Sequence, residues 1–342
     1  MLEKPDVPDE KLISCLRDHY GLHVTQVAFL PLGNDVNTAV YRVVADDGTP
    51  YFLKLRSGAF DETTVTIPRF LHSQGIAQII APIATAAGRL WMRMDAFAMI
   101  LFPFVVGKNG VAAPLSERQW TDLGTALRRI HMAAVPPALK RRIPHEQYAP
   151  YWRDLVRTFQ ARAEENAFTD PIAAALAAFL RDRRDEISHL IERADALGAV
   201  LRAQLPDMVL CHADIHAANV LIDANGALYI VDWDTLIVAP KERDLMFIGG
   251  GVASVWNSAR AEALFYRGYG RTEINPVALA YYRYERIVED IAAYCEELLL
   301  TDEGGADRER GLRSVIGQFL PNRVVAIAYA SDPLFNQSAM NP

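Results

Sequence analysis

The stretch Val209–Asp234 constrains the fold of this chain more than any other part of the sequence. It contains two short apolar runs separated by the turn Asp223–Gly226, which ends in an Asn-Gly pair. Asn-Gly between apolar runs is typical of a tight β-hairpin, because both residues accept the positive φ angles that such turns need. The hairpin would bring Asn219 and Asp232 near the same end of a small sheet, with Asp214 in the loop before it. We therefore expect these three oxygen-bearing side chains to converge on one point.

The types and spacing of these three residues suit phosphoryl transfer. That reaction needs a carboxylate that orients and deprotonates the attacking hydroxyl, and oxygen ligands for the Mg²⁺ that bridges the nucleotide phosphates. Asn219 follows Asp214 by five positions, and Asp232 comes at the end of the second apolar run. Kinases use this order and spacing. The sequence therefore indicates a kinase.

A competing interpretation starts from the histidines of the same loop. His212, Asp214 and His216 are two residues apart and would share one face of a strand, as metal ligands of a phosphoesterase can do. That interpretation leaves Asn219 and Asp232 unexplained, whereas the kinase interpretation explains both. In the kinase interpretation His212 holds the loop, and His216 is a surface or loop residue.

The stretch resembles the Brenner-type motif of the aminoglycoside phosphotransferase family, small-molecule kinases with a protein-kinase-like fold. Two downstream segments, Lys241–Val252 and Tyr281–Ile291, look like the spectinomycin phosphotransferase branch of that family. The resemblance covers nearly the whole chain. It implies an α+β, bilobal fold in which residues 1–104 form a nucleotide-binding lobe with an antiparallel sheet and a helix. After a hinge, residues 105–342 would form a larger, mainly helical lobe for catalysis and substrate binding.

The resemblance also implies roles for individual residues. Asp214 would orient and activate a substrate hydroxyl, while Asn219 and Asp232 would hold Mg²⁺. Lys54 would neutralise the phosphates of ATP and pair with a glutamate. The helical block between hinge and catalytic loop would form part of the substrate cleft.

Lys54 lies within the apolar run Tyr51–Leu55, where a lysine is costly unless its charge is paired or reaches solvent. The functional interpretation makes it the phosphate-binding lysine of the third strand; the structural alternative is an edge strand whose solvent face carries Lys54 and Arg56. Glu62 is the candidate partner by elimination. Pro68 complicates that assignment, since proline breaks a helix: either the helix is kinked or Glu62 lies just ahead of it.

Further contacts with ATP are implied by the resemblance alone. The segment around Asn34 would be the nucleotide-positioning loop, although it has one glycine, and a polar hairpin turn is the alternative. The apolar run Ala96–Phe104 predicts a buried strand, and backbone groups from about Phe102 to Phe104 would bind adenine. The breakers in residues 105–110 are those expected of a linker.

Helical patterns dominate the rest of the chain. Ser116 and Gln119 form a predicted capping box, and the helix that follows ends at His131, which we interpret as a packing or capping residue. Asp170-Pro171 predicts another helix start, with an interruption near residues 182–183. Asp244 could cap a helix or brace the catalytic loop.

Four residues are candidates for contacts with the substrate. Trp256 could line the cleft. Glu285 and Glu289 lie four apart on one predicted helix face and could bind the amines of a cationic substrate, together with Asp290. The alternative is that Arg286 and Asp290 form a surface ion pair, which contributes little.

Composition excludes several other classes. The 342 residues have a formal net charge of −7, which argues against a nucleic-acid binder and is compatible with a cationic small-molecule substrate. The apolar run Ala96–Val106 is too short to cross a bilayer, and the polar N-terminal segment is unlike a signal peptide. Three widely spaced cysteines support neither a disulfide framework nor a zinc site, so we expect a cytoplasmic protein.

The sequence thus predicts an ATP-dependent O-phosphotransferase that acts on a hydroxyl of spectinomycin and gives resistance to that antibiotic. Two alternatives remain: a kinase of another hydroxylated amine or amino sugar (choline-like or aminoglycoside), and a nucleotide-binding module without catalysis. A protein kinase is disfavoured, because Asp232 is followed by Trp-Asp rather than Phe-Gly and no Ala-Pro-Glu occurs. The oligomeric state cannot be predicted.

Overall fold

A computed structural model describes residues 4–33, 37–252, 255–301 and 305–333, and the chain divides into two compact units. The first unit consists of Met1–Leu115, Ala133–Ile143 and Ala218–Leu236. The second unit consists of Ser116–Met132, Pro144–Ala217 and Ile237–Pro342. Each unit is built from segments that are distant in the sequence.

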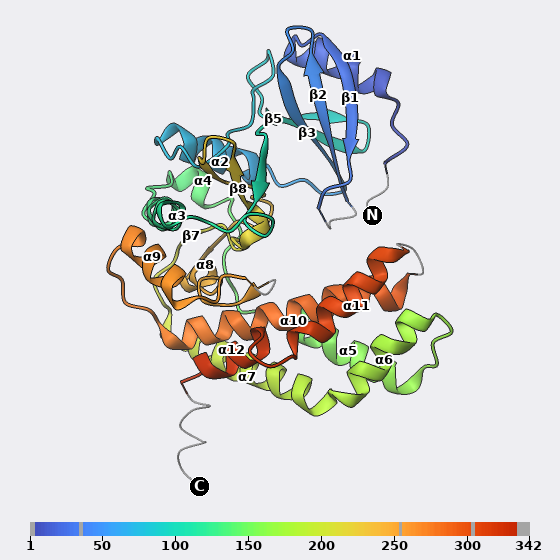
Figure 1. Ribbon diagram of the computed structural model, residues 1–342, viewed down its shortest axis with the longest axis vertical. Helices are drawn as coiled ribbons and strands as arrows, with labels where there is room; N and C mark the ends of the chain where they lie inside the picture. Colours follow the sequence, from blue (N-terminus) through green and yellow to red (C-terminus); the bar gives the residue numbers. More distant parts are fainter. Residues whose placement is uncertain (1–3, 34–36, 253–254, 302–304, 334–342) are drawn as a thin grey trace. The chain divides into compact units, whose positions relative to one another are not determined.

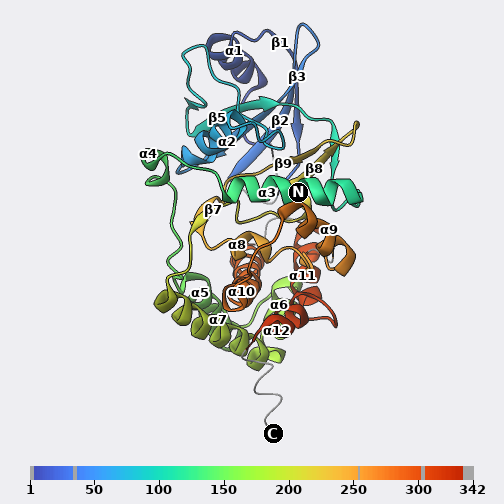
Figure 2. The ribbon, with the colours of Figure 1, turned by 90° about the vertical axis from the view of Figure 1, so that its left-hand side faces the viewer.

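A five-stranded antiparallel sheet of order β1-β2-β3-β5-β4 dominates the first unit (Figure 1). Helix α1 (Asp9–Tyr20) packs on this sheet through Leu12 and Leu16, which join a buried core with Tyr41, Leu53 and other strand residues (Figure 2). The strands are β1 (Val24–Leu30), β2 (Thr38–Ala45), β3 (Pro50–Ser57), β4 (Met92–Met94) and β5 (Phe97–Pro103), and the other helices are α2 (Thr63–Ser73) and the short α4 (Pro137–Lys140). The predicted antiparallel sheet with helix is confirmed.

Strand alternation places Lys54 on the face of the sheet opposite α1. Leu53 and Leu55 belong to the core under α1, and successive side chains of a strand point to opposite faces. β3 is also an interior strand, paired with β2 on one side and β5 on the other. The edge-strand alternative for Lys54 is therefore wrong.

The first unit contains the predicted hairpin as part of a three-stranded sheet of order β6-β8-β9. β8 (Val220–Asp223) and β9 (Leu228–Ile230) pair antiparallel around the Asn-Gly turn, and the one-turn 3₁₀ helix Ala217–Asn219 precedes them. The expected linker contains β6 (Gly107–Asn109), which pairs with β8. Gly107 permits that pairing, because a Cβ there would lie 2.3 Å from the carbonyl oxygen of Ile222. Ile79 forms an isolated parallel bridge to Ile230 of β9.

The second unit is mainly helical, as predicted. The long helix α10 (Pro276–Leu300) packs against six other helices of this unit (Figure 1). Those six are α5 (Tyr151–Glu165), α6 (Pro171–Asp182), α7 (Arg184–Gln204), α8 (Glu242–Leu245), α11 (Ala306–Gln318) and α12 (Val324–Ser331). α3 (Glu117–His131) packs on α9 (Ala259–Tyr269), and β7 (Val209–Cys211) pairs with β10 (Ile237–Ala239). In the part of the chain that the structure describes, no helix combines the length and apolarity needed to cross a bilayer.

The predicted helix starts are confirmed by their caps. Ser116 accepts from the backbone N–H of Gln119, whose side chain accepts from the N–H of Ser116 in return. The carboxylate of Asp170 accepts from the N–H of Ala173 at 2.8 Å. Each cap satisfies a donor that the first turn of a helix leaves unpaired.

Helices α3 and α9 approach closely because glycines lie at their contact. A Cβ on Gly124 would lie 2.1 Å from the carbonyl oxygen of Phe265, and one on Gly268 would lie 1.9 Å from that of Thr121. Neither oxygen can move away, since both belong to helix backbone. The crossing therefore requires glycine on both helices.

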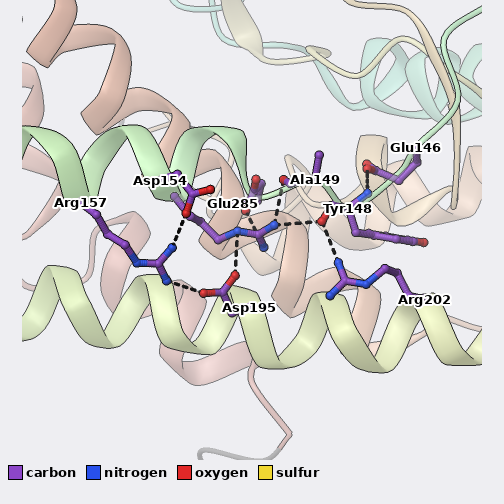
Figure 3. Close-up of polar contacts among 9 residues, drawn as sticks. Glu146, Tyr148, Ala149, Asp154, Arg157, Asp195, Arg202 and Glu285 are labelled. Carbon is purple, nitrogen blue, oxygen red and sulfur yellow. Dashed lines mark hydrogen bonds and ion pairs between the residues drawn. The ribbon is translucent and has the colours of Figure 1, made fainter.

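A buried arginine joins three helices of the second unit (Figure 3). Arg153 on α5 is 1% exposed and donates to the carbonyl oxygens of Tyr148 and Ala149 at 3.0 and 2.8 Å. Its guanidinium also lies 3.1 Å from Asp195 on α7 and 3.3 Å from Glu285 on α10, at ion-pair distance without aligned hydrogen bonds. Burial raises the pKa of Glu285 to about 7, although the charge of Arg153 opposes this rise.

The glycine contact gives a stability prediction. We expect Gly268→Ala to lower the free energy of unfolding by at least about 2 kcal/mol, because the added methyl overlaps backbone that cannot relax. Gly317→Ala is the matched control: it adds a methyl to α11, where nothing lies within 4 Å of the new Cβ. Helix propensity alone should make the control neutral or up to about 1 kcal/mol more stable. Equal urea midpoints for the two variants would contradict the close contact.

The Glu285 carboxyl gives a prediction on pH. Because its pKa in the folded protein, about 7, lies above the usual 4.5, its contribution to stability is fully present below pH 4.5 and is lost as the pH rises through 7. We expect the free energy of unfolding to fall by about 3 kcal/mol over that interval relative to Glu285→Gln. Urea titrations from pH 5 to 8 measure the difference. Glu309→Gln, at an exposed residue of α11, is the control, and parallel curves for wild type and Glu285→Gln would refute the assignment.

Candidate functional site

The first unit gathers three charged side chains around Lys54. The Nζ of Lys54 lies 2.8 Å from Oδ2 of Asp234 and 3.2 Å from Oδ1 of Asp232. Arg56, two residues along β3, donates from Nη1 to the same Oδ2 of Asp234 at 2.5 Å. Two cations thus face two carboxylates. Lys54 and Arg56 lie on the same face of β3 because they alternate with Leu53 and Leu55, which point to the buried face.

The surroundings of Lys54 keep its ammonium charged. Burial by itself lowers the pKa of Lys54, whose side chain is 12% exposed. The charges of Asp232 and Asp234 outweigh burial, so that the pKa lies above its usual value. Asp232 is far more open, with 52% of its side chain exposed. A fixed cation beside an accessible carboxylate is the arrangement that an anionic ligand with a bound metal ion requires.

The end of the hairpin places Asn219 next to Asp232, as predicted. The backbone N–H of Val231, the residue before Asp232, donates to the carbonyl oxygen of Asn219 at 3.0 Å. This hydrogen bond brings the backbone of Asp232 close to Asn219. Asp232 has φ +64°, a left-handed conformation that costs energy for a residue with a side chain and often occurs at functional sites. The amide and carboxylate offer oxygen donors only, which suits Mg²⁺ rather than a softer metal.

Glu62 corrects one prediction. It lies just ahead of α2, which begins at Thr63 and contains Pro68, so the alternative that placed Glu62 before the helix is the right one. Its carboxylate accepts from Nε1 of Trp91 at 3.2 Å and from Nη2 of Arg142 at 2.6 Å. Lys54 instead contacts the carboxylates of Asp232 and Asp234. Among the described residues, Lys54 and Glu62 are therefore not paired with each other.

The other predicted nucleotide contacts lie on or near β5. Phe102 packs edge-on against Phe52, with ring centroids 6.4 Å apart. Phe104 follows the strand, and the guanidinium of Arg42 lies over its ring at 5.6 Å. Asn34 lies outside the described residues, so its predicted role stays a prediction.

The second unit holds the predicted catalytic residue, Asp214, in a second charged cluster. Arg286 on α10 donates from Nη1 to Oδ1 of Asp214 at 2.6 Å and from Nε to Oδ1 of Asp290 at 2.9 Å. Nε2 of His216 lies 3.3 Å from Oδ2 of Asp214. His216 is therefore a loop residue that contacts the carboxylate.

Asp244 braces the loop that carries Asp214. Its buried carboxylate accepts from the backbone N–H of His212 at 3.0 Å and of Ala213 at 2.6 Å, and Oδ2 also lies 2.9 Å from Nε2 of His131. This selects the bracing role of Asp244 over the capping role. His212 holds the loop as expected, since its Nδ1 accepts from the N–H of Asp214 at 3.2 Å.

Asp244 also belongs to a cluster of three side chains whose types can bind metal ions. Ligand atoms of His131, Cys211 and Asp244 lie within 4.8 Å of one another, and all three residues are buried. The thiol of Cys211 donates to the carbonyl oxygens of Ala239 and Pro240, and burial raises its pKa well above the usual range. A protonated thiol is a poor metal ligand. The cluster is therefore a hydrogen-bonded part of the core.

The carboxylates predicted to bind a cationic substrate differ in their surroundings. Glu285 is buried against Arg153, and Glu289 lies 3.6 Å from Arg243 of α8. An arginine thus lies beside each glutamate, and the prediction that Glu285 and Glu289 bind amines of a substrate stays a prediction. Asp290 differs, since it lines a cavity. The other residues around that cavity are Met246, Gly250, Val252, Arg283, Arg286, Ile287 and Val324.

Trp256 is 8% exposed and packs edge-on against Trp120, with ring centroids 5.0 Å apart.

Sequence reasoning missed Asp234 and misjudged Arg286. Asp234 follows Asp232 at the spacing of two that places side chains on one face of an extended chain, and this was the available signal. Arg286, interpreted as one half of a surface pair, has a side chain only 19% exposed and bridges two carboxylates. Since Asp214 belongs to the second unit and Asn219 and Asp232 to the first, their convergence stays a prediction.

An antiparallel sheet unit carrying a paired lysine, with a mainly helical unit carrying a braced Asp-bearing loop, defines the class of kinase-like α+β proteins. Comparison with known proteins agrees with this class. A model of the phosphotransferase enzyme family matches residues 28–284. The chain belongs to this family and is an ATP-dependent small-molecule kinase.

Individual relatives refine the comparison. The chain is 39% identical to a spectinomycin phosphotransferase solved in complex with ADP and spectinomycin, with a TM-score of 0.89 over 96% of this chain and 99% of that one. It is 27% identical over 246 residues to protein StrN of Streptomyces griseus, which covers 67% of this chain and 71% of the relative. An amicoumacin kinase with 17% identity and a TM-score of 0.62, over 97% of each chain, shares the fold. The predicted kinase-like fold and family are confirmed.

Proposed function

We propose that this protein is an ATP-dependent O-phosphotransferase that phosphorylates a hydroxyl of spectinomycin and thereby gives resistance to the antibiotic. The observation that carries the proposal is the similarity to the spectinomycin phosphotransferase, which extends over 96% of this chain at 39% identity. A match that includes nearly all of the helical unit supports a shared acceptor, because the helices that we propose to bind the acceptor lie there and not in the hairpin.

Asp214 is the proposed catalytic residue. Its carboxylate, 20% exposed, would accept a hydrogen bond from the acceptor hydroxyl. It would take the proton as the new P–O bond forms and the bond between the γ-phosphorus and the leaving ADP breaks. Burial by itself raises the pKa of Asp214, but the hydrogen bond with His216 and the charge of Arg286 outweigh it and hold the pKa well below its usual range. Asp214 is therefore ionised at neutral pH, the state that this role needs.

Asn219 and Asp232 are the proposed Mg²⁺ ligands. When bound, Mg²⁺ would offset negative charge on the nucleotide phosphates. The oxygen donors at the end of the hairpin and the open carboxylate of Asp232 suit this ion. Lys54 would contribute a fixed positive charge to the same phosphates, with Asp234 orienting its ammonium.

The remaining assignments complete the proposal. The backbone near Phe102 and Phe104 would bind adenine, with residues 1–104 as the nucleotide-binding lobe and residues 105–342 as the catalytic and substrate-binding lobe. Asp290 would meet an amine of the cationic acceptor, since it lines a cavity, and Trp256 would contribute to the acceptor cleft. The proposed location of this small-molecule kinase is the cytoplasm.

A second candidate function is the same chemistry on another hydroxylated amine or amino sugar, such as choline or an aminoglycoside. The residues Asp214, Asn219, Asp232 and Lys54 serve that reaction equally well, because they act on phosphate and hydroxyl groups common to all these acceptors. A nucleotide-binding module without catalysis is disfavoured, since all four residues are intact.

The acceptor is tested by ATP consumption. We expect purified protein to consume ATP in a Mg²⁺-dependent reaction that spectinomycin stimulates at least about 100-fold, because chemistry waits for an oriented hydroxyl. Choline and a panel of aminoglycosides should give no stimulation. If one of these compounds stimulated ATP consumption and spectinomycin did not, that compound would be the acceptor, and the proposed phosphotransfer reaction would still hold. ATP binding with no stimulation by any compound would favour the non-catalytic module.

The role of Asp214 is tested by substitution. We expect Asp214→Ala to lower kcat by about 1,000-fold while ATP binding changes little, since the side chain acts on the acceptor and not on the nucleotide. Single-turnover phosphorylation and nucleotide titration measure the two effects. Asp154→Ala, which removes an exposed carboxylate of α5, is the control and should leave both unchanged. Full activity of Asp214→Ala would exclude Asp214 as the catalytic residue.

A further inference from the structure

Helix α10 reaches the catalytic loop through one side chain. Arg286 donates from Nη1 to Asp214 at 2.6 Å and from Nε to Asp290 at 2.9 Å, so that one planar guanidinium joins two carboxylates. Asp290 lies one turn along the same helix, at the spacing of four that brings side chains together. It therefore fixes the direction in which the guanidinium points, and the free end of the fork meets Asp214.

Packing holds this guanidinium in place. Its carbon Cζ lies 5.7 Å from the ring centroid of Phe247, which is 1% exposed, and the ring of His216 packs on the same phenylalanine at 6.1 Å. The two groups that contact the carboxylate of Asp214, one on each oxygen, thus rest on a single buried ring. Charge-assisted hydrogen bonds of an arginine fork are short and directional.

We propose that Arg286 is the positioning residue of this kinase: anchored by Asp290, it sets the orientation and the ionisation of the Asp214 carboxylate. The inference rests on the proposed role of Asp214. Arg286 bonds to Oδ1, and His216 lies beside Oδ2, so both oxygens of the carboxylate have a positioning contact. Arg286 itself acts through Asp214 and has no bond to form or break.

The charged groups around Asp214 indicate what removal of Arg286 would do. From its own loop His212 and His216 face the carboxylate, and from α10 comes Arg286, with Asp290 and Glu289 behind it. Without the arginine, burial and the two nearby carboxylates would raise the pKa of Asp214, and His212 and His216 would oppose that rise. Its pKa would then rise toward or above the ordinary range for aspartate.

The kinetic test compares Arg286→Gln with wild type. We expect kcat to fall about 100-fold, KM for ATP to change less than about two-fold, and the acid limb of the kcat–pH profile to move up by at least about one pH unit. Arg286→Lys, which keeps the charge but not the fork, should recover part of kcat and most of the pH profile. Arg313→Gln, at an exposed arginine of α11, is the matched control.

A direct titration makes the test independent of turnover. Carboxyl carbon NMR, with the Asp214 signal assigned from Asp214→Asn, should show no titration of Asp214 in wild type down to about pH 4 and a midpoint within the measured range in Arg286→Gln. Asp290→Asn, which removes the anchor of Nε but also one nearby negative charge, should move the midpoint less than Arg286→Gln does. It serves also as the second variant if Arg286→Gln does not fold.

The outcomes separate this inference from the proposed function. Loss of activity in Asp214→Asn together with a wild-type pH profile and titration in Arg286→Gln would overturn the positioning role and leave the function standing. Activity retained in Asp214→Asn would remove the catalytic role on which the inference depends. A shifted Asp214 titration, even in the absence of an active acceptor, would establish that Arg286 controls its ionisation.

Discussion

The loop that carries the candidate catalytic residue depends on one buried carboxylate, Asp244. It is fully buried and accepts hydrogen bonds from two consecutive backbone N–H groups, those of His212 and Ala213, while His131 lies against Oδ2, the oxygen that also accepts from His212. Ala213 has φ +69°, a conformation that costs a residue with a side chain about 1–2 kcal/mol. The hydrogen bonds from Asp244 offset that cost. Asp214 is the next residue, so its position follows from a backbone bend that Asp244 stabilises.

Each unit balances the charges of its own candidate residues. In the first unit Lys54 and Arg56 face Asp232 and Asp234, and in the second Arg286 lies between two carboxylates. A buried charge without a partner costs several kcal/mol, so neither group could form without this compensation. Charges paired in this way hold the candidate binding residues in place, and such preorganisation lowers the ordering cost of binding.

Local patterns predicted the parts of the fold that depend on local chemistry. The Asn-Gly turn, the capping box at Ser116 and the strand around Lys54 were confirmed, because turn geometry, caps and alternation are encoded within a few residues. Ion-pair partners that are distant in the sequence were not predictable in this way. Glu62 was assigned to Lys54 by elimination along the sequence, yet Arg142, eighty residues away, takes its carboxylate.

Helix periodicity shows the same limit. Spacings of four on α10 correctly placed Arg286 beside Asp290, and also Glu285 near Glu289. What the spacing cannot reveal is what each face packs against. Arg153 of α5 and Arg243 of α8 converge on the two glutamates, and the loop of Asp214 meets the arginine. Arg286, for which a surface pair was the alternative, is thereby a half-buried bridge between two carboxylates.

An arginine bound to a catalytic carboxylate makes that carboxylate a weaker base, which at first appears unfavourable for proton removal. Phosphoryl transfer through a loose transition state places little demand on the basicity of the residue that receives the proton, because the hydroxyl loses it only once the P–O bond is well advanced. Orientation is what the reaction needs most, and effective concentration is where most of the gain arises. A carboxylate held by Arg286 on one oxygen and His216 on the other has little rotational freedom left to lose. The arrangement around Asp214 therefore favours positioning over basicity, as the chemistry of this family requires.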